Sequence, residues 1–227
     1  MMRLFDTAWL SSKIRIGIDI WRQLGGKTFF GRVLPWLFCR RYYFYSQPIH
    51  STWPALSCSC PVVVKFADDN DLALVAALSP GDATVSELKK RLRDGHLCFT
   101  GWLNDKLVHF RWIFTRCLYL PYLHRTLLLS SFEVYVDETY TLPELRGRGI
   151  AAYTGRLLRL ALFERGFKRY SCAVASWNKA QQKLTEKFGM EKVGEGGFID
   201  FLLGKRFIWK GRVKDHGDGR IEICVPE

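Results

Sequence analysis

Arginines and glycines gather where a helix is predicted to begin. Residues 142–158 read LPELRGRGIAAYTGRLL and place Arg146, Gly147, Arg148 and Gly149 ahead of an apolar helical pattern. The first turn of a helix leaves backbone N–H groups without partners and carries the positive end of the helix dipole. Cations there oppose the dipole, so a bound anion best explains them. Glycine lets that anion approach the backbone, and forked guanidiniums match phosphate oxygens. The stretch predicts a phosphate or diphosphate site.

Other phosphate-binding loops fit less well. The nucleotide-hydrolase P-loop needs Gly, four residues and then Gly-Lys-Ser/Thr, and the sequence has no such string. A dinucleotide-binding fingerprint is formally present as Gly147, Gly149 and Ala152. The strand before it is predicted to end near Val136, which is too far upstream for that fold. The simpler alternative is that the arginines are surface charges and the glycines serve a turn.

The loop resembles the diphosphate loop of the GNAT superfamily of N-acyltransferases. In that family a strand and a short acidic turn precede Arg/Gln-x-x-Gly-x-Gly/Ala at a helix start; here VYVDETYTLPE precedes Arg146, Gly149 and Ala151. A later strand leading to Asn, and a helix ending in Gly plus an apolar residue, are matched by CAVASWN and KLTEKFGM. The resemblance covers roughly residues 61–210. These coupled motifs are more specific than a glycine pattern alone.

The resemblance implies acetyl-CoA or a longer acyl-CoA as donor, and no metal. Its diphosphate is expected on the loop amides and its pantetheine arm along the preceding strand, with an asparagine on the other side. A backbone amide near Val136 is expected to polarise the thioester carbonyl. The cofactor-binding residues implied in this way are Val134, Tyr135, Val136, Arg146, Gly147, Arg148, Gly149, Ile150, Ala151 and Asn178.

The residues that handle protons depart from the family pattern. Many relatives have a tyrosine seven residues after the asparagine and a glutamate five before it, where this chain has Thr185 and Ala173. We expect Glu133, Asp137 or His109 to act as base, directly or through water, and Thr185 to serve the leaving thiolate through water. The simpler alternatives are a solvent-facing Glu133, a core His109 and a helix-surface Thr185.

The function implied is an N-acyltransferase that moves an acyl group from acyl-CoA to a primary amine of an amino sugar, an amino acid or another small amine. An acyl-carrier protein is a second possible donor. The alternative is a GNAT-like binding module with little catalysis, whose basic N-terminal region meets a membrane surface, an acidic carrier protein or, less favoured, nucleic acid. We expect a cytoplasmic protein, at most peripheral to the inner face of the membrane.

The composition is that of a globular chain with an acidic partner. Of 227 residues, 48% are hydrophobic and 25% charged, and the formal net charge is +12. Residues 1–60 hold eight Lys/Arg against two Asp/Glu, and four of the eight tryptophans. That combination predicts an interface. The seven cysteines show no CxxC pair, which favours reduced thiols over a zinc site.

Local patterns predict a mixed α/β fold: a GNAT-like, mostly antiparallel central sheet, flanked by helices and splayed at its central strands. Thr84 and Glu87 have the spacing of a capping box. Expected strands lie at 61–68, 96–103, 107–114, 131–136, 168–175, 190–194 and 198–209, and expected helices at 68–79, 84–95, 150–166 and 178–188. The predicted division is an extension over 1–60, the acyltransferase domain over 61–213 and a tail over 214–227.

The helix that follows the loop carries both apolar and basic residues. Tyr153, Leu157 and Ala161 recur at helical spacing and predict its buried stripe. Arg159, together with other arginines of this helix, is expected on a solvated face or against the 3′-phosphate end of the donor.

Overall fold

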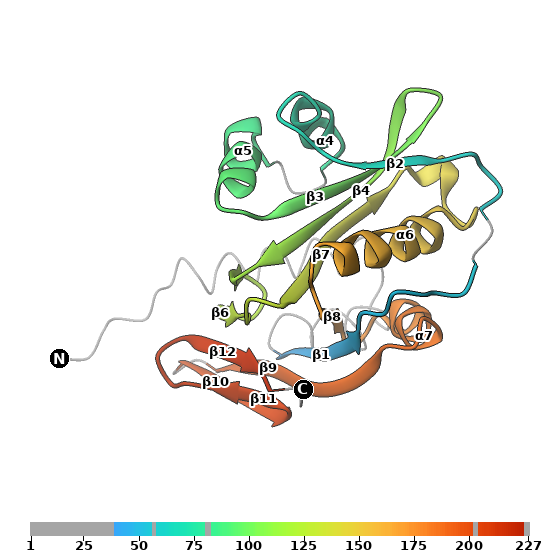
Figure 1. The fold of residues 1–227 in the computed structure, drawn as a ribbon. Coiled ribbons are helices and arrows are strands. Elements are labelled where there is room, and N and C mark those ends of the chain that lie inside the picture. Colours follow the sequence, from blue (N-terminus) through green and yellow to red (C-terminus); the bar gives the residue numbers. More distant parts are fainter. Residues whose placement is uncertain (1–38, 56–57, 80–82, 202–203, 225–227) are drawn as a thin grey trace, which may run out of the picture.

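The computed structural model describes residues 39–55, 58–79, 83–201 and 204–224, and residues 1–38 of the predicted extension lie outside it. Two sheets and several helices make up these residues (Figure 1). The strands are β1 (Cys39–Pro48), β2 (Val63–Phe66), β3 (Leu97–Leu103), β4 (Lys106–Thr115), β5 (Cys117–Leu120), β6 (Arg125–Leu128), β7 (Glu133–Thr141), β8 (Arg169–Ala175), β9 (Glu191–Phe201), β10 (Gly204–Gly211), β11 (Val213–Asp215) and β12 (Arg220–Ile223). The helices are α4 (Leu72–Leu78), α5 (Val85–Arg93), the 3-10 turn η2 (Pro143–Leu145), α6 (Ile150–Glu164) and α7 (Lys179–Lys187).

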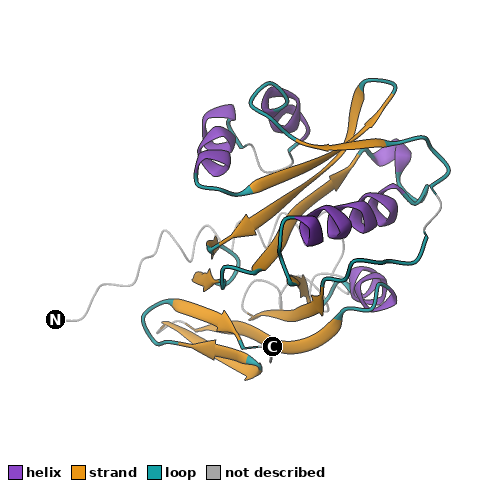
Figure 2. Cartoon of the chain, in the orientation of Figure 1, coloured by secondary structure: helices purple, strands orange, loops and turns teal. Residues whose placement is uncertain are grey.

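The large sheet has eight strands in the order β10-β9-β1-β8-β7-β4-β3-β2. Each neighbouring pair is antiparallel except β7 and β8, which are parallel. A parallel pair needs a crossover, and α6 supplies it between β7 and β8. Figure 2 shows the helices arranged around this sheet. The mixed α/β fold with a mostly antiparallel sheet is the one predicted.

Helices cover the two faces of the large sheet. Leu158 and Leu162 of α6 share an apolar cluster with Ile113 and Val136 on one face. Leu72 and Leu88, from α4 and α5, share another cluster with Phe110 and Trp112 on the opposite face. The capping box predicted for α5 is present, with the amide of Glu87 donating to Oγ1 of Thr84 at 3.3 Å.

β1 corrects the predicted domain boundary at residue 60. This strand lies inside the large sheet between β8 and β9, and not in an extension. Successive side chains of a strand point to opposite faces, so the aromatic run of β1 reaches both layers of the core. Phe44 and Tyr45 are accordingly 0% and 1% exposed.

A second sheet, in the order β11-β12-β6-β5, covers part of the large one. Leu127, Ile221 and Ile223 of this sheet cluster with Phe44 and Tyr135 of the large sheet. β12 pairs in parallel with β6 and β11 pairs with β12, so residues 214–223 of the predicted tail belong to this sheet. The sequence did not predict this sheet, because its four strands are three or four residues long.

The buried face of α6 is also not the predicted one. Tyr153, Leu157 and Ala161 are only partly buried, whereas the buried set includes Gly155 and Arg159. Ile150, Leu158 and Leu162 also belong to the buried set, so apolar residues lie on both sides of the helix and their spacing does not identify the buried side.

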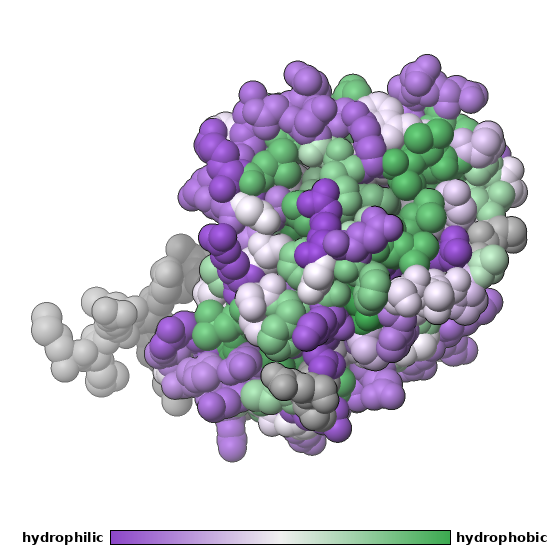
Figure 3. All heavy atoms as spheres, in the orientation of Figure 1, coloured by the Kyte–Doolittle hydropathy of each residue, from purple (hydrophilic) through white to green (hydrophobic). Residues whose placement is uncertain are grey.

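The surface carries both hydrophilic and hydrophobic residues. In Figure 3 hydrophilic residues lie over α4 and α5 at the top and over the lower strands, and hydrophobic residues are visible between them. Within the described part of the chain, no helix has the length and apolar character needed to cross a membrane.

Candidate active site

β7 and β8 part from each other and leave a cleft. They pair only at Glu133↔Arg169, Val134↔Tyr170 and Tyr135↔Ser171, although each strand runs on beside its other neighbour. A cleft of about 750 Å³ lies in this opening, walled by β7, β8, α6 and α7. The splay predicted at the central strands is therefore present, and the free edge of β7 begins at Val136.

A bulge shapes the β7 side of the cleft. Arg111 and Trp112 of β4 face Thr139 and Asp137, which leaves Glu138 unpaired at φ 47°. Arg91 of α5 holds the bulge, with Nη1 2.6 Å from Oε2 of Glu138. Asp137, just before the bulge, lines the cleft.

The loop before α6 has the geometry of an anion cradle. Gly147 and Gly149 have φ 78° and 82°, a backbone that glycine adopts without strain. No side chain caps α6, and its first turn holds no acidic residue. Within the described residues the amides of 147–152 donate to no acceptor, and the next amide, that of Tyr153, donates to the carbonyl of Gly149 at 2.9 Å. Several adjacent N–H groups are thus available to one ligand.

The two arginines of the loop have different positions. Arg146 lines the cleft and is held by a bond from its Nε to the carbonyl of Thr141 at 3.2 Å. The side chain of Arg148 is exposed and is not among the lining residues. Its carbonyl accepts from the amide of Ser59 at 3.3 Å and from the Ser59 hydroxyl at 3.1 Å, so the segment before β2 braces the loop.

Ala151 lines the cleft beside the loop, whereas Ile150 is 1% exposed and packs in the core with Val62. The side chain predicted at position 150 is therefore a packing residue, and only its amide belongs to the cradle. Val134 and Tyr135 lie in the paired part of β7, so of that trio Val136 alone lines the cleft.

α7 forms the wall opposite α6. Asn178 lines the cleft and caps α7, with its Oδ1 accepting from the amide of Gln181 at 3.1 Å. Thr185 also lines the cleft and is 3% exposed, so it is not a helix-surface residue. Its Oγ1 lies 3.5 Å from Nε2 of Gln181.

Two of the three candidate bases have structural partners elsewhere. Glu133 lies where β7 and β8 still pair, with Oε1 3.3 Å from Nε of Arg169 and Oε2 accepting from the amide of Ser130 at 3.2 Å. His109 is 0% exposed, lies 2.8 Å from Oγ1 of Thr141 through Nδ1, and burial lowers its pKa to about 3. Neither residue lines the cleft, so the geometry does not favour the base role predicted for Glu133.

Asp137 is the candidate base that reaches the cleft. Burial raises the pKa of its carboxyl to about 6. Its Oδ1 accepts from the amide of Glu138 at 2.9 Å, and its Oδ2 lies 3.5 Å from the hydroxyl of Tyr122, which is 2.8 Å from that of Tyr135. A carboxylate with a pKa just below neutrality is suited to accept a proton.

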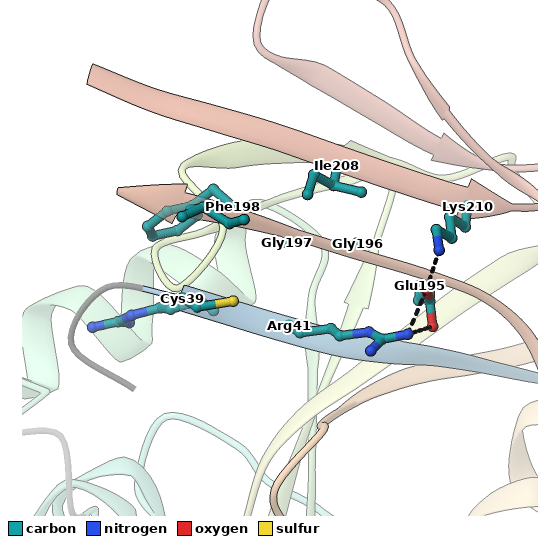
Figure 4. Close-up of a pocket in the computed structure, with 10 residues that line it drawn as sticks. Cys39, Arg41, Glu195, Gly196, Gly197, Phe198, Ile208 and Lys210 are labelled. Carbon is teal, nitrogen blue, oxygen red and sulfur yellow. Dashed lines mark hydrogen bonds and ion pairs between the residues drawn. The ribbon is translucent and has the colours of Figure 1, made fainter. Parts of the chain in front are cut away.

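A second, smaller cavity of about 250 Å³ lies on β1, β9 and β10. Figure 4 shows Arg41 and Lys210 directed at Glu195. Nη2 of Arg41 lies 2.7 Å from Oε2 of Glu195, and the Nζ atoms of Lys192 and Lys210 lie 3.3 Å and 3.8 Å from its oxygens. No pattern in the sequence predicted this cavity.

Comparisons with known proteins place these features in a family. The profile described as Acetyltransferase (GNAT) family matches residues 70–190, whereas no curated protein matches the chain. A functionally unknown conserved protein from Staphylococcus epidermidis is 12% identical, with 82% of this chain and 68% of that chain covered and a TM-score of 0.49. A putative GNAT acetyltransferase from Novosphingobium aromaticivorans is 15% identical, with 68% and 60% covered and a TM-score of 0.48.

The aminoglycoside N-acetyltransferase AAC(6')-Iy in complex with CoA is 19% identical, with 60% of this chain and 92% of that chain covered and a TM-score of 0.47. The match to the family profile extends over more than half of the chain and contains the loop, the cleft strands and α7. The chain therefore belongs to the acetyltransferase (GNAT) family.

Proposed function

We propose that this protein is an N-acyltransferase that moves an acyl group from an acyl-CoA to the primary amine of a small molecule, such as an amino sugar or an amino acid. One observation carries the proposal: the amides of residues 147–152, which donate to no acceptor in the described ranges, lie beside a cleft of about 750 Å³. A cradle of this kind at a helix N-terminus suits a diphosphate. Membership of the family supports the same donor.

The residues around the cleft fit such a donor. The loop amides and Arg146 would hold its diphosphate, because no carboxylate of the described residues accepts from these amides and the first turn of α6 has no acidic residue. The free edge of β7 from Val136 would pair with the amides of the pantetheine arm. Asn178 would close the arm from the α7 side.

The chemistry that the donor supplies is an activated thioester carbonyl. An uncharged amine attacks this carbonyl, so that a C–N bond forms and the C–S bond breaks. Asp137 takes the proton that the amine nitrogen must lose. The leaving thiolate must gain a proton, and Thr185, buried in the α7 wall, passes one on through water. The amide near Val136 stabilises charge on the carbonyl oxygen.

Calorimetric titration of the protein with CoA and acetyl-CoA tests the donor. We expect Arg146→Glu to weaken both affinities about tenfold or more, because a carboxylate then faces the diphosphate. Arg93→Glu is the matched control, since Arg93 is exposed on α5 and the change in net charge is equal. Unaltered CoA binding by Arg146→Glu would contradict the proposed cradle.

A panel of amines separates the enzyme from a binding module. Release of CoA from acetyl-CoA that depends on an added amine supports the transferase. Binding of CoA without turnover on an amino sugar, an amino acid or a polyamine supports the module.

A further inference from the structure

Two buried guanidiniums share the α6 wall of the cleft. Arg111 of β4 is 8% exposed and Arg159 of α6 is 5% exposed, and both line the cleft. They meet above Gly155, where an added Cβ would lie 3.0 Å from Nη1 of Arg111 and 3.4 Å from Nη1 of Arg159. Two like charges are therefore side by side and largely out of water.

The partners of these two arginines are neutral. Arg111 donates from Nη1 to the hydroxyl of Tyr170 and from Nη2 to the carbonyl of Ala151, both at 3.2 Å. Arg159 donates from Nη1 to the carbonyl of Gly155 at 3.0 Å and stacks 4.4 Å from the ring centroid of Tyr170. In the part of the chain that the structure describes, no carboxylate forms an ion pair with either residue, and both Nε atoms are buried without a partner.

Such an arrangement is costly without an anion. A buried charge is normally paired, because desolvation otherwise disfavours it, and a like charge nearby adds repulsion. Burial accordingly lowers the pKa of Arg159, and the neighbouring Arg111 contributes in the same direction. A ligand with negative charge would relieve both effects and would satisfy the free Nε donors.

The pair is separate from the diphosphate cradle. Gly155, below the guanidiniums, is five residues into α6, or about 7.5 Å along the axis from the first helical residue. Tyr170, which contacts both arginines, pairs with Val134 where β7 and β8 are still joined. The arginines thus lie toward the closed end of the cleft. The simplest ligand group for them is a second anion on the molecule whose diphosphate binds the loop.

The side of the large sheet on which the two arginines lie indicates which of the two substrates carries the anion. Val136 clusters with α6, on the side of the arginines, whereas Tyr135 clusters with the second sheet. Asp137 is two residues after Tyr135 and projects to that second side. The amine must approach Asp137, so the α6 side belongs to the acyl donor. A carboxylate matches forked guanidinium donors and is small enough for a buried position.

We propose that Arg111 and Arg159 bind a terminal carboxylate of the transferred acyl group, so that the preferred donor is the CoA thioester of a dicarboxylic acid. The inference rests on the proposed acyl-CoA-dependent function and specifies its donor. It assigns to the arginine pair a role in selecting the acyl group and not in the bond-breaking step.

Titration calorimetry with free CoA, acetyl-CoA and succinyl-CoA tests the inference on the whole chain. We expect the protein to bind succinyl-CoA about tenfold more tightly than acetyl-CoA. Arg159→Met should remove that preference while the affinities for acetyl-CoA and free CoA stay within about twofold. Arg159→Lys should keep part of the preference, because it retains the charge but not the fork. Arg165→Met, an exposed arginine just after α6, is the matched control and should keep all of it.

Three other results would contradict the inference. Equal affinity of the unmodified protein for acetyl-CoA and succinyl-CoA overturns the inference and leaves the transferase proposal standing. Equal weakening of all three ligands by Arg159→Met overturns it too, because the pair would then serve the phosphates of CoA. Binding of none of them overturns the transferase proposal as well. Thermal unfolding checks that each variant folds, and Arg111→Met replaces Arg159→Met if that variant does not.

Discussion

Cations have different partners in the two cavities described above, both of which are lined by residues that the structure describes. In the smaller cavity Arg41 and Lys210 are directed at one carboxylate, that of Glu195 (Figure 4), which also forms an ion pair with Lys192. In the cleft Arg111 and Arg159 lie beside each other, and among the described residues they donate to and stack on neutral groups. The pKa values respond in opposite directions, since the hydrogen bond to Glu195 raises that of Arg41 and burial lowers that of Arg159.

This difference in partners distinguishes cations that pair within the fold from cations that are available to a ligand. Arg41 is half exposed and already paired with Glu195, so its ion pair contributes little to the stability of the fold. The cleft arginines are buried and have no ion-pair partner among the residues that the structure covers, which destabilises the folded chain until an anion binds. The same logic applies to the loop before α6, where cations stand at the positive end of a helix.

The largest effect is expected when a carboxylate is placed in the loop. Gly149→Asp puts a negative charge and a side chain at φ 82°, where the diphosphate would lie. We expect CoA affinity to fall about a hundredfold or more, measured by calorimetry. Gly217→Asp is the matched control, because Gly217 has φ 81° in an exposed turn with open space around it. Both variants should lose about 1 kcal/mol of stability, but only Gly149→Asp should lose binding.

The second prediction concerns the side of the cleft that faces the amine. Asp137→Asn should lower kcat about a hundredfold with little change in CoA affinity, because it removes a proton acceptor and keeps the shape. The activity of the unmodified enzyme should rise with pH through about 6, and the variant should lack that rise. Glu133→Gln is the control and should keep its kcat. A loss of kcat in Glu133→Gln as large as in Asp137→Asn would contradict the assignment of Asp137 as the base.

The stability of the folded state should fall as the carboxyl of Asp137 loses its proton, whereas the activity should rise. Burial raises the pKa of Asp137 from 3.8 to about 6, so the folded state binds a proton that the unfolded state releases between these values. This contribution to stability is therefore complete below about pH 4 and is lost as the pH rises past about 6, by about 3 kcal/mol in total. Tyr122, Tyr135, Glu138 and Arg91 also face or act on this carboxyl and stay unchanged in the comparison. Denaturant unfolding of the protein and of Asp137→Asn across this range measures the difference, which should vanish if the carboxyl is ordinary.

How far the sequence could predict the fold depended on whether the signal was local. The capping box of Thr84 and Glu87 and the apolar pattern of α6 are set by residues a few positions apart, and both helices are present. β1 has no such signal. Its basic and aromatic residues indicate a surface until the pairing of Tyr43 with Val174 and Glu195 places the strand between two others. Pairing over more than 100 residues is not visible in a local pattern.

The candidate site divides in the same way. Spacing alone placed the loop glycines at a helix start, and Asn178 and Thr185 line the cleft, while their roles stay predictions. Glu133 and Asp137 were not separable, because the end of the β7–β8 pairing decides which of them reaches the opening. Arg159 was expected on a solvated face or against the 3′-phosphate end of the donor, and its burial excludes the first of these. An arginine four residues after a glycine, inside an apolar run, was the available signal, since the glycine leaves room for a guanidinium.

The smallest expected effect compares the two cavities directly. Arg159→Met removes a buried, unpaired charge and should raise the free energy of unfolding by about 1 kcal/mol in the absence of ligand, after the loss of its stacking on Tyr170. Glu195→Gln leaves three cations without their carboxylate and should lower stability, by less than about 1 kcal/mol because Arg41 is half exposed. Urea unfolding of both variants measures the two signs. If Arg159→Met is destabilising and Glu195→Gln is not, the cleft arginine holds the fold together, and the distinction between the two cavities is wrong. If the signs are as expected, the rise in the free energy of unfolding of Arg159→Met measures how much the unpaired charge of Arg159 destabilises the ligand-free protein.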